Sequence, residues 1–309
     1  MDKNGRTNLF LGWAAVLMLA ASVLFTACPN ATKTPESPTP MPEYTPVAYD
    51  KLAEYLANTA STTEINKIEV TGLEAEHLKG DDFGYPPKPS PLGAILQAHP
   101  TKKVALKLGG SVSALMDMPF CFYGCKSLVR VTAIPKGVKD MTGCFDSCTS
   151  LTQAPVLPES VTKMTGCFRD CTSLTKAPAI PKGVDDMKSC FASCINLTQA
   201  PAIPEGVKDM SYCFQNCTSL TKAPASIPAS VTEMSGCFLD CEVLTSVTLK
   251  CNYGDGKFVS AFKSCIALGE KSIKVPQAYY GNYTTAKALH SMVVPGTTEA
   301  EKKAKFEGV

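Results

Sequence analysis

This sequence of 309 residues lacks most of the features that indicate catalysis or nucleic-acid binding. Its formal net charge is only +2 and its lysines and arginines do not cluster, which argues against a nucleic-acid partner. It has three histidines, no C-x-x-C pair, no Gly-rich phosphate loop and no serine in a nucleophile-elbow motif. The sequence therefore predicts no enzymatic activity and no cofactor.

Long apolar runs are also scarce, and the one that stands out opens the chain. Lys3 and Arg6 precede an apolar stretch over residues 9–27 that stops at Cys28, which is the layout of a secretion signal. The letters LFTAC that end at Cys28 resemble a bacterial lipobox. We expect residues 1–27 to be a lipoprotein signal peptide and Cys28 to be the lipidation site that anchors the protein to a membrane. An uncleaved transmembrane helix is the alternative.

Two further segments precede the repetitive part of the chain. Residues 28–46 contain six prolines, which cannot pack a core and favour the extended polyproline II conformation, so we expect a tether. Residues 47–117 are expected to form a small α/β capping unit, because a stack of repeats needs a cover at its end. Within it, apolar periodicity predicts helices over 50–58 and 92–98 and strands over 67–71 and 103–108.

Cysteine is the residue in excess, with 15 copies, most of them in pairs spaced four residues apart. The first cysteines of the pairs stand at 121, 144, 167, 190, 213 and 237, so the repeat is 23 residues long with one step of 24. A seventh unit keeps the second cysteine as Cys265 and has Ala261 in place of the first. Because alanine can replace it, the first position requires a small buried side chain more than it requires a thiol.

Each unit follows the pattern M-x-x-C-F-x-x-C-x-x-L-T-x-A-P-x-I-P-x-x-V. Cys144, Phe145, Cys148 and Leu151 lie on one face of a short helix or 3-10 turn. The proline after each Leu-Thr-x-Ala segment removes a backbone donor, so we expect two brief strands per coil and no long sheet. One coil cannot bury its own apolar face, so the coils must stack. The predicted fold is an α/β solenoid, a right-handed leucine-rich-repeat-like stack of about seven coils behind the N-terminal cap.

The units resemble the BspA-type leucine-rich repeats of bacterial surface proteins. The resemblance covers residues 118–275, and the letters AFKSC that begin at Ala261 match the family form most closely. The capping unit and residues 271–276 also resemble parts of spirochaetal leucine-rich lipoproteins, and we expect residues 276–309 to form a C-terminal cap and tail. The resemblance implies a surface adhesin whose partners are host matrix proteins or other bacterial surface proteins, located at the outer membrane or cell surface. The periplasmic face is the alternative location.

The cysteine pairs admit three interpretations at this stage. They are buried reduced thiols that pack as small apolar side chains, disulfides within or between coils, or thiolate ligands of a metal ion. We favour the first and expect no metal. The expected structural core cysteines are Cys121, Cys125, Cys144, Cys148, Cys167, Cys171, Cys190, Cys194, Cys213, Cys217, Cys237, Cys241 and Cys265.

A candidate binding surface follows from the third position of the Leu-Thr-x-Ala segments, which is polar in successive coils. We name it the polar stripe, and its residues are Arg130, Gln153, Lys176, Gln199 and Lys222. Stacking would align these side chains opposite an extended, mildly acidic protein. Two other functions stay open, a structural envelope spacer without a dedicated ligand and a thiol-rich or metal-binding protein.

Overall fold

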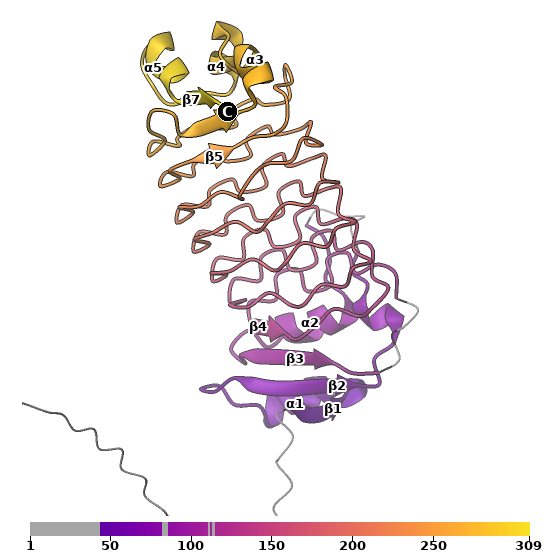
Figure 1. Ribbon diagram of the computed structural model, residues 1–309. Helices are drawn as coiled ribbons and strands as arrows, with labels where there is room; N and C mark the ends of the chain where they lie inside the picture. Colours follow the sequence, from indigo (N-terminus) through magenta and orange to yellow (C-terminus); the bar gives the residue numbers. More distant parts are fainter. Residues whose placement is uncertain (1–43, 82–85, 111, 113–114) are drawn as a thin grey trace, which may run out of the picture. The chain divides into compact units, whose positions relative to one another are not determined.

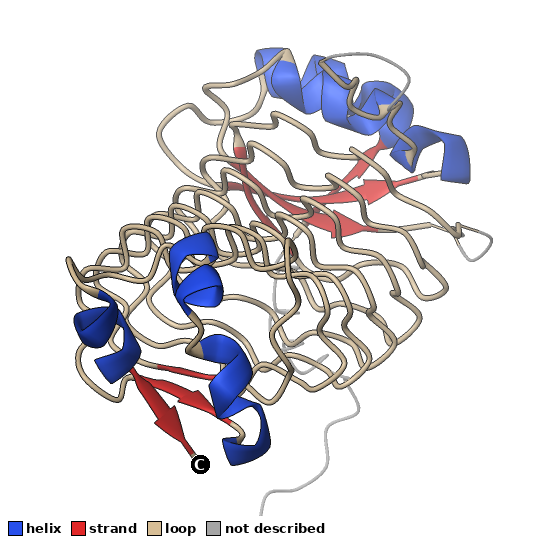
Figure 2. Ribbon diagram, turned by 90° about the horizontal axis from the view of Figure 1, so that it is seen from above, coloured by secondary structure: helices blue, strands red, loops and turns tan. Residues whose placement is uncertain are grey.

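In the computed structural model, which describes residues 44–81, 86–110, 112 and 115–309, helices and regular strands occur at the two ends of the described chain. Coils without either occupy the region between β4 (Leu128–Val131) and β5 (Val247–Thr248) (Figures 1 and 2). The expected signal peptide, Cys28 and most of the expected tether lie outside the described residues. Within the described part of the chain, no helix is long and apolar enough to span a membrane.

The N-terminal unit is a parallel sheet with short helices. Its strands β1 (Thr45–Ala48), β2 (Asn66–Thr71), β3 (Val104–Leu108) and β4 lie side by side in that order. The helices are η1 (Tyr49–Lys51), α1 (Leu52–Asn58), η2 (Ala75–Leu78) and α2 (Pro91–Gln97). The two helices and two strands expected in this unit are thereby confirmed as α1, α2, β2 and β3.

The boundaries of the N-terminal unit are set by pairing between distant segments. Strand β1 includes Thr45 and Pro46, which the sequence pattern assigned to the tether, because these residues pair with Ile68 and Glu69 of β2. At the other end β3 pairs with β4, which belongs to the first coil of the repeats. The cap and the repeats therefore share one sheet and one continuous hydrophobic core.

The segment that carries the cysteine pairs forms consecutive turns. Cys144 N donates to Met141 O (3.1 Å) and Cys148 N donates to Phe145 O (3.1 Å), the i to i+3 pattern expected of a 3-10 turn. Gly143 and Ser147, each just before a cysteine, have φ values of 57° and 62°, so the chain cannot continue as a helix. The intervening N–H groups reach the next coil instead, as in Phe145 N to Cys167 O (2.8 Å). Of the two expected forms, a short helix or a 3-10 turn, left-handed residues select a ladder of separate turns.

A stack of phenylalanine rings forms the centre of the solenoid. The rings are those of Phe122, Phe145, Phe168, Phe191, Phe214, Phe238 and Phe262, one from each of seven coils. Neighbouring centroids are 5.2–6.1 Å apart, and beyond the first pair the rings are parallel within 9°. All seven side chains are fully buried. The ring spacing fixes the distance between coils on this side of the stack, and the predicted solenoid fold is confirmed.

Outside the turns, the expected brief strands are reduced to isolated parallel bridges. One column of bridges runs through Asp117, Asp140, Lys163, Asp186, Asp209 and Glu233. A second column follows the polar stripe and is incomplete, with bridges between Arg130 and Gln153 and between Gln199 and Lys222. The prolines expected to interrupt the ladder lie in this second column.

The C-terminal end closes the stack with a second small sheet. Strands β5, β6 (Ile273–Val275) and β7 (Phe306–Gly308) are parallel and adjacent in that order. The helices are η3 (Gln277–Tyr279), α3 (Tyr280–Tyr283), α4 (Ala286–Ser291) and α5 (Glu299–Ala304). Helix α5 lies in the expected C-terminal cap and tail, and Thr298 and Glu301 form its capping box. Strand β7, which the sequence pattern did not indicate, follows it and covers the edge of β6.

Candidate functional site

The structure places the polar stripe on the surface of the repeats. The side chains of Arg130, Gln153, Lys176, Gln199 and Lys222 are all exposed. The bridges bring the first two together and the last two together, with Lys176 between the pairs. Within the described residues none of the three cations forms an ion pair. The stripe therefore presents uncompensated positive charge along one face of the solenoid.

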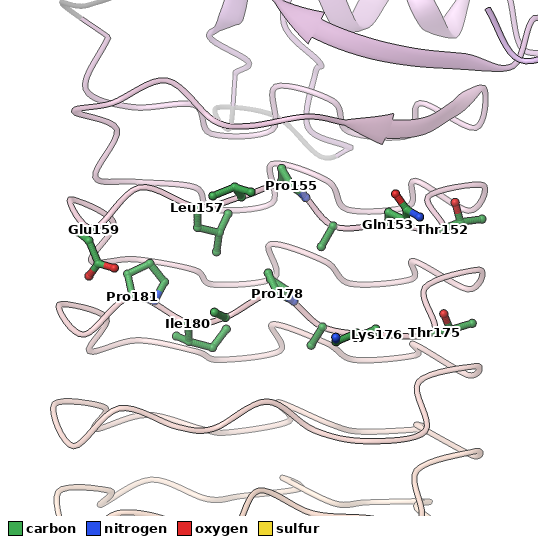
Figure 3. Close-up of a pocket in the computed structure, with 14 residues that line it drawn as sticks. Thr152, Gln153, Pro155, Leu157, Glu159, Thr175, Lys176, Pro178, Ile180 and Pro181 are labelled. Carbon is green, nitrogen blue, oxygen red and sulfur yellow. The ribbon is translucent and has the colours of Figure 1, made fainter. Parts of the chain in front are cut away.

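An apolar groove borders the stripe. Residues 152–157, 159 and 175–181 line its first part, a hollow of about 800 Å³, and residues 175–180 and 198–202 line a continuation of about 770 Å³. Figure 3 shows Gln153 and Lys176 toward one end of the first hollow, Leu157 and Ile180 farther along, and Glu159 at the other end. We refer to the two hollows together as the central groove. The first hollow carries opposite charges at its two ends, Lys176 toward one and Glu159 at the other.

The apolar part of the central groove was not anticipated from the sequence. Val156 is 71% exposed, and Leu157 and Ile180 are half-buried, whereas Ile134 and Ile227 at equivalent positions of other coils are buried. A signal was present, because the A-P-x-I-P and A-P-x-L-P segments bring apolar side chains directly after the polar stripe. The partial exposure of those side chains depends on packing between coils, which the pattern does not show.

The thirteen expected core cysteines and Cys251 are all buried free thiols. From Cys148 onward, the cysteine at the second position of each coil donates its Sγ proton to the carbonyl of the phenylalanine in the preceding coil, whereas Cys125 donates to Gly93 O (3.4 Å). Examples are Cys171 Sγ to Phe145 O (3.2 Å), Cys217 Sγ to Phe191 O (3.1 Å) and Cys265 Sγ to Phe238 O (2.9 Å). The same carbonyls also accept a backbone N–H within their own coil, such as Cys194 N to Phe191 O. The thiol thus satisfies the second lone pair of a buried oxygen.

Burial suppresses the reactivity of these thiols. It raises the pKa of Cys265 to about 12 and raises the pKa values of Cys148, Cys194 and Cys241 further. A thiol is nucleophilic only as the thiolate, so these groups are protonated and unreactive at neutral pH. The arrangement fits the interpretation of the cysteines as packing groups with a hydrogen-bonding role at the second position.

Removing the second cysteine of a pair is expected to destabilise the protein more than removing the first. Cys217→Ala leaves Phe191 O with one hydrogen bond fewer, whereas Cys213→Ala introduces the residue that the seventh coil already has at this position, Ala261. We expect Cys217→Ala to lower the free energy of unfolding by about 1 kcal/mol more than Cys213→Ala, measured by denaturant titration under reducing conditions. Equal effects would mean that the thiol hydrogen bond contributes nothing.

A second, smaller hollow of about 340 Å³ lies on the turn side of the coils and includes Phe120, Gly143 and Arg169 among its lining residues. Gly143 has a positive φ, and a β-carbon there would collide with the Phe120 ring, so the position requires glycine. Beneath the hollow Asp146 is 2% exposed and pairs with Arg169 through Nη2 (2.5 Å). Burial raises the pKa of Asp146, and Arg169 partly opposes the effect. Because the carboxylate is enclosed and already paired, this hollow lacks a free acidic group.

Comparison with known proteins identifies the family of the repeats. The family model described as the BspA type leucine rich repeat region matches in six copies, over residues 118–221 and 167–287, and these ranges together cover more than half of the chain. The chain belongs to the BspA-type leucine-rich-repeat family. Proteins with BspA-type repeats are typically bacterial surface proteins, and repeats of this kind generally serve as interaction scaffolds without catalytic activity.

Two solved structures are similar to this BspA-type protein. A leucine-rich repeat protein from T. pallidum is 26% identical, with a TM-score of 0.45 over 58% of this chain and 81% of that one. A leucine-rich repeat protein from Bacteroides ovatus is 16% identical, with a TM-score of 0.34 over 59% of this chain and 63% of that one. No curated protein matches the BspA-type chain.

Proposed function

We propose that this protein is a surface-displayed adhesin that binds other proteins, host matrix or bacterial surface proteins, along the face formed by the polar stripe and the central groove. The observation that carries the proposal is the placement of three unpaired cations beside an apolar hollow on the same face. The charge favours encounter with an acidic partner and the apolar surface stabilises the complex. The residues of the stripe act together, because stacking repeats the same position in each coil.

The proposal extends to the segments that precede the described residues. Residues 1–27 would direct export, Cys28 would carry the lipid, and the proline-rich residues that follow would hold the repeats away from the membrane. The sequence of six prolines between 29 and 46 supports a tether, since proline-rich chains are extended and stiff. The N-terminal and C-terminal units would act as covers that prevent the ends of the stack from pairing with other chains.

Neutralising the stripe is expected to weaken binding. We would measure the affinity of the purified full-length chain for immobilised fibronectin, laminin, collagen and bacterial outer-surface protein fractions, and compare a variant carrying Arg130→Gln, Lys176→Gln and Lys222→Gln. A loss of about tenfold is expected in low salt, with a smaller salt dependence for the variant.

The matched control removes equal charge from another part of the surface, with Lys139→Gln, Lys188→Gln and Lys274→Gln, whose side chains are also exposed. This control should bind as the parent does. Equal binding by the stripe variant would remove the site from the proposal. The absence of saturable binding to every probe, or survival of the repeats when intact cells are treated with protease, would favour the structural spacer instead.

A further inference from the structure

The middle of the candidate binding face contains a backbone segment without hydrogen bonds. Among the described residues, the N–H and C=O groups of Thr175–Ile180 have no partner, although the coils on either side are paired with their outer neighbours. Val156 N donates to Thr132 O (3.3 Å) on one side, and Ala200 N donates to Lys222 O (3.0 Å) on the other. Pro178 has no N–H, so the segment offers five donors and six acceptors.

Prolines at one register position weaken the ladder in the part of the sheet that opens here. Pro155, Pro178, Pro201 and Pro224 occupy equivalent positions in four successive coils, where each removes a ladder donor. The flanking coils have Thr132 and Thr248 at this position instead. At both of those coils the ladder is closed, since Thr132 N donates to Leu106 O (2.9 Å) and Thr248 O accepts from Ile227 N (2.8 Å).

The open segment does not have room for an additional strand between it and its neighbours. On the far side of the same coils, the rings of Phe145, Phe168 and Phe191 are 5.3 and 5.6 Å apart, which fixes the spacing. An inserted strand needs about 4.8 Å on each of its two sides. The unpaired groups must therefore bind water or a ligand that lies on the face. Both hollows of the central groove are lined by this segment.

We propose that Thr175–Ile180 is a main-chain docking site for an extended peptide segment of a protein partner. The proposal rests on the protein-binding function proposed above and specifies how the partner is held. Main-chain hydrogen bonds from a peptide lying on the face to the unpaired groups of the segment supply affinity, and the side-chain contacts supply specificity. Lys176 selects an acidic side chain at one end of the peptide, Leu157 and Ile180 accept an apolar one, and Glu159 favours a basic one at the other end.

Charge and backbone chemistry together favour a partner over this chain's own proline-rich segment. Six prolines between residues 29 and 46 remove N–H groups that docking to the carbonyls of Thr175–Ile180 would use. A second copy of the chain would have to present an extended segment of suitable charge. Both of these occupants are tested as outcomes below.

The first measurement is hydrogen exchange of the purified full-length chain alone. The amides of Thr175, Lys176, Ala177, Ala179 and Ile180 are expected to exchange rapidly, while the turn amides of Phe168 and Phe191 are protected by their bonds to the next coil. Protection of the open segment that is independent of protein concentration would show that the chain's own residues cover it, and protection that rises with concentration would show a second copy. Either result overturns the proposal.

The second measurement uses a fluorescent peptide selected on the full-length chain from a random displayed library. Two versions of the peptide are compared, one with N-methyl groups on the odd-numbered residues and one with them on the even-numbered residues. One version should lose about tenfold in affinity per hydrogen bond removed, and the other should bind as the unmodified peptide does. Binding should also protect the five amides from exchange. Main-chain docking is overturned if no peptide can be selected, or if the two N-methylated versions bind equally well.

Two variants of the protein complete the test. Pro178→Thr introduces the residue found in the flanking coils and is expected to close the ladder, protect the neighbouring amides and reduce peptide affinity about tenfold. Lys176→Gln should reduce affinity only for peptides with an acidic residue, and Lys188→Gln on the turn side should have no effect. If matrix-protein binding depends on the stripe but is indifferent to Pro178→Thr, the adhesin function stands and the docking mode is wrong.

Discussion

Replacing Phe191 by alanine is expected to lower the free energy of unfolding by about 3–5 kcal/mol, because the ring is fully buried at the middle of the stack. Its centroid lies 5.6 Å from that of Phe168 and 5.7 Å from that of Phe214, with interplanar angles of 4° and 5°. The substitution removes both ring contacts and leaves a cavity that the coils cannot fill, since the turn ladder holds them in place. Denaturant titration of the full chain under reducing conditions measures the effect.

The loss of Phe191 should also change the form of the unfolding transition. In a stack where each coil contacts only its neighbours, weakening one interface at the centre uncouples the two halves. We expect a broader transition for Phe191→Ala than for the parent, seen as a lower apparent m-value. Ile195→Ala, in the same coil but with a partly exposed side chain, is the control and should change stability by less than about 0.5 kcal/mol. Equal effects of the two substitutions would contradict the role of the ring stack.

Arg169→Ala is expected to lower the free energy of unfolding by about 2–3 kcal/mol at neutral pH, because it leaves the buried Asp146 carboxylate without its cation. The remaining side-chain partner of Asp146 is the Ser147 hydroxyl, which donates at 2.9 Å. Arg169 is itself 45% exposed, so its own desolvation is modest and most of the effect comes from the stranded acid. The variant and parent would be compared by denaturant titration at several pH values.

The direction in which the stability deficit of Arg169→Ala changes with pH follows from the pKa of Asp146. Burial raises the pKa of Asp146, so its folded state binds a proton more readily than the unfolded state, and stability associated with this group increases as the pH falls through the folded pKa. Removing Arg169 takes away the charge that opposes this rise, so the deficit of the variant should shrink as the pH is lowered from 7 toward about 4.

Two further variants test the origin of the Arg169 effect. Asp146→Asn combined with Arg169→Ala should recover much of the lost stability, because no charge is then buried. Lys163→Ala removes an exposed cation 4.0 Å from Asp140 and should change stability by less than about 0.5 kcal/mol. A deficit for Arg169→Ala that stays constant with pH would show that lost packing, and not the stranded carboxylate, is responsible.

Much of the architecture could be predicted because the repeat imposes it. A period of 23 residues with cysteine, phenylalanine and leucine at fixed places can bury its apolar groups only by stacking, and the structure shows that stack. Ala261, at the first cysteine position of the seventh unit, correctly indicated that the two cysteine positions have different requirements. The reason is the hydrogen bond from the second thiol to a phenylalanine carbonyl, which became visible only in the structure. The prolines correctly indicated an interrupted ladder.

Other features depended on contacts that no local pattern contains. The spacing of Cys144, Phe145 and Cys148 suggested a short helix or a 3-10 turn, and left-handed backbone at Gly143 and Ser147 selects the turns. Glycine at the first of these positions was a hint, but serine at the second was not, since the inter-coil hydrogen bonds stabilise its positive φ. The start of β1 and the position of β7 likewise follow from pairing with distant strands.

The sequence by itself determined that this chain stacks coils, buries its cysteines and displays a polar stripe, because a regular period converts local composition into a fixed surface and a fixed core. Only the tertiary structure decided which coils pair across the stripe, which apolar side chains stay exposed, and that the backbone of Thr175–Ile180 is left without partners. The reason is that a proline removes only its own donor. Whether the remaining groups find partners depends on how neighbouring coils align, because coils with the same proline are bridged at Gln199 and Lys222 and unbridged at Lys176.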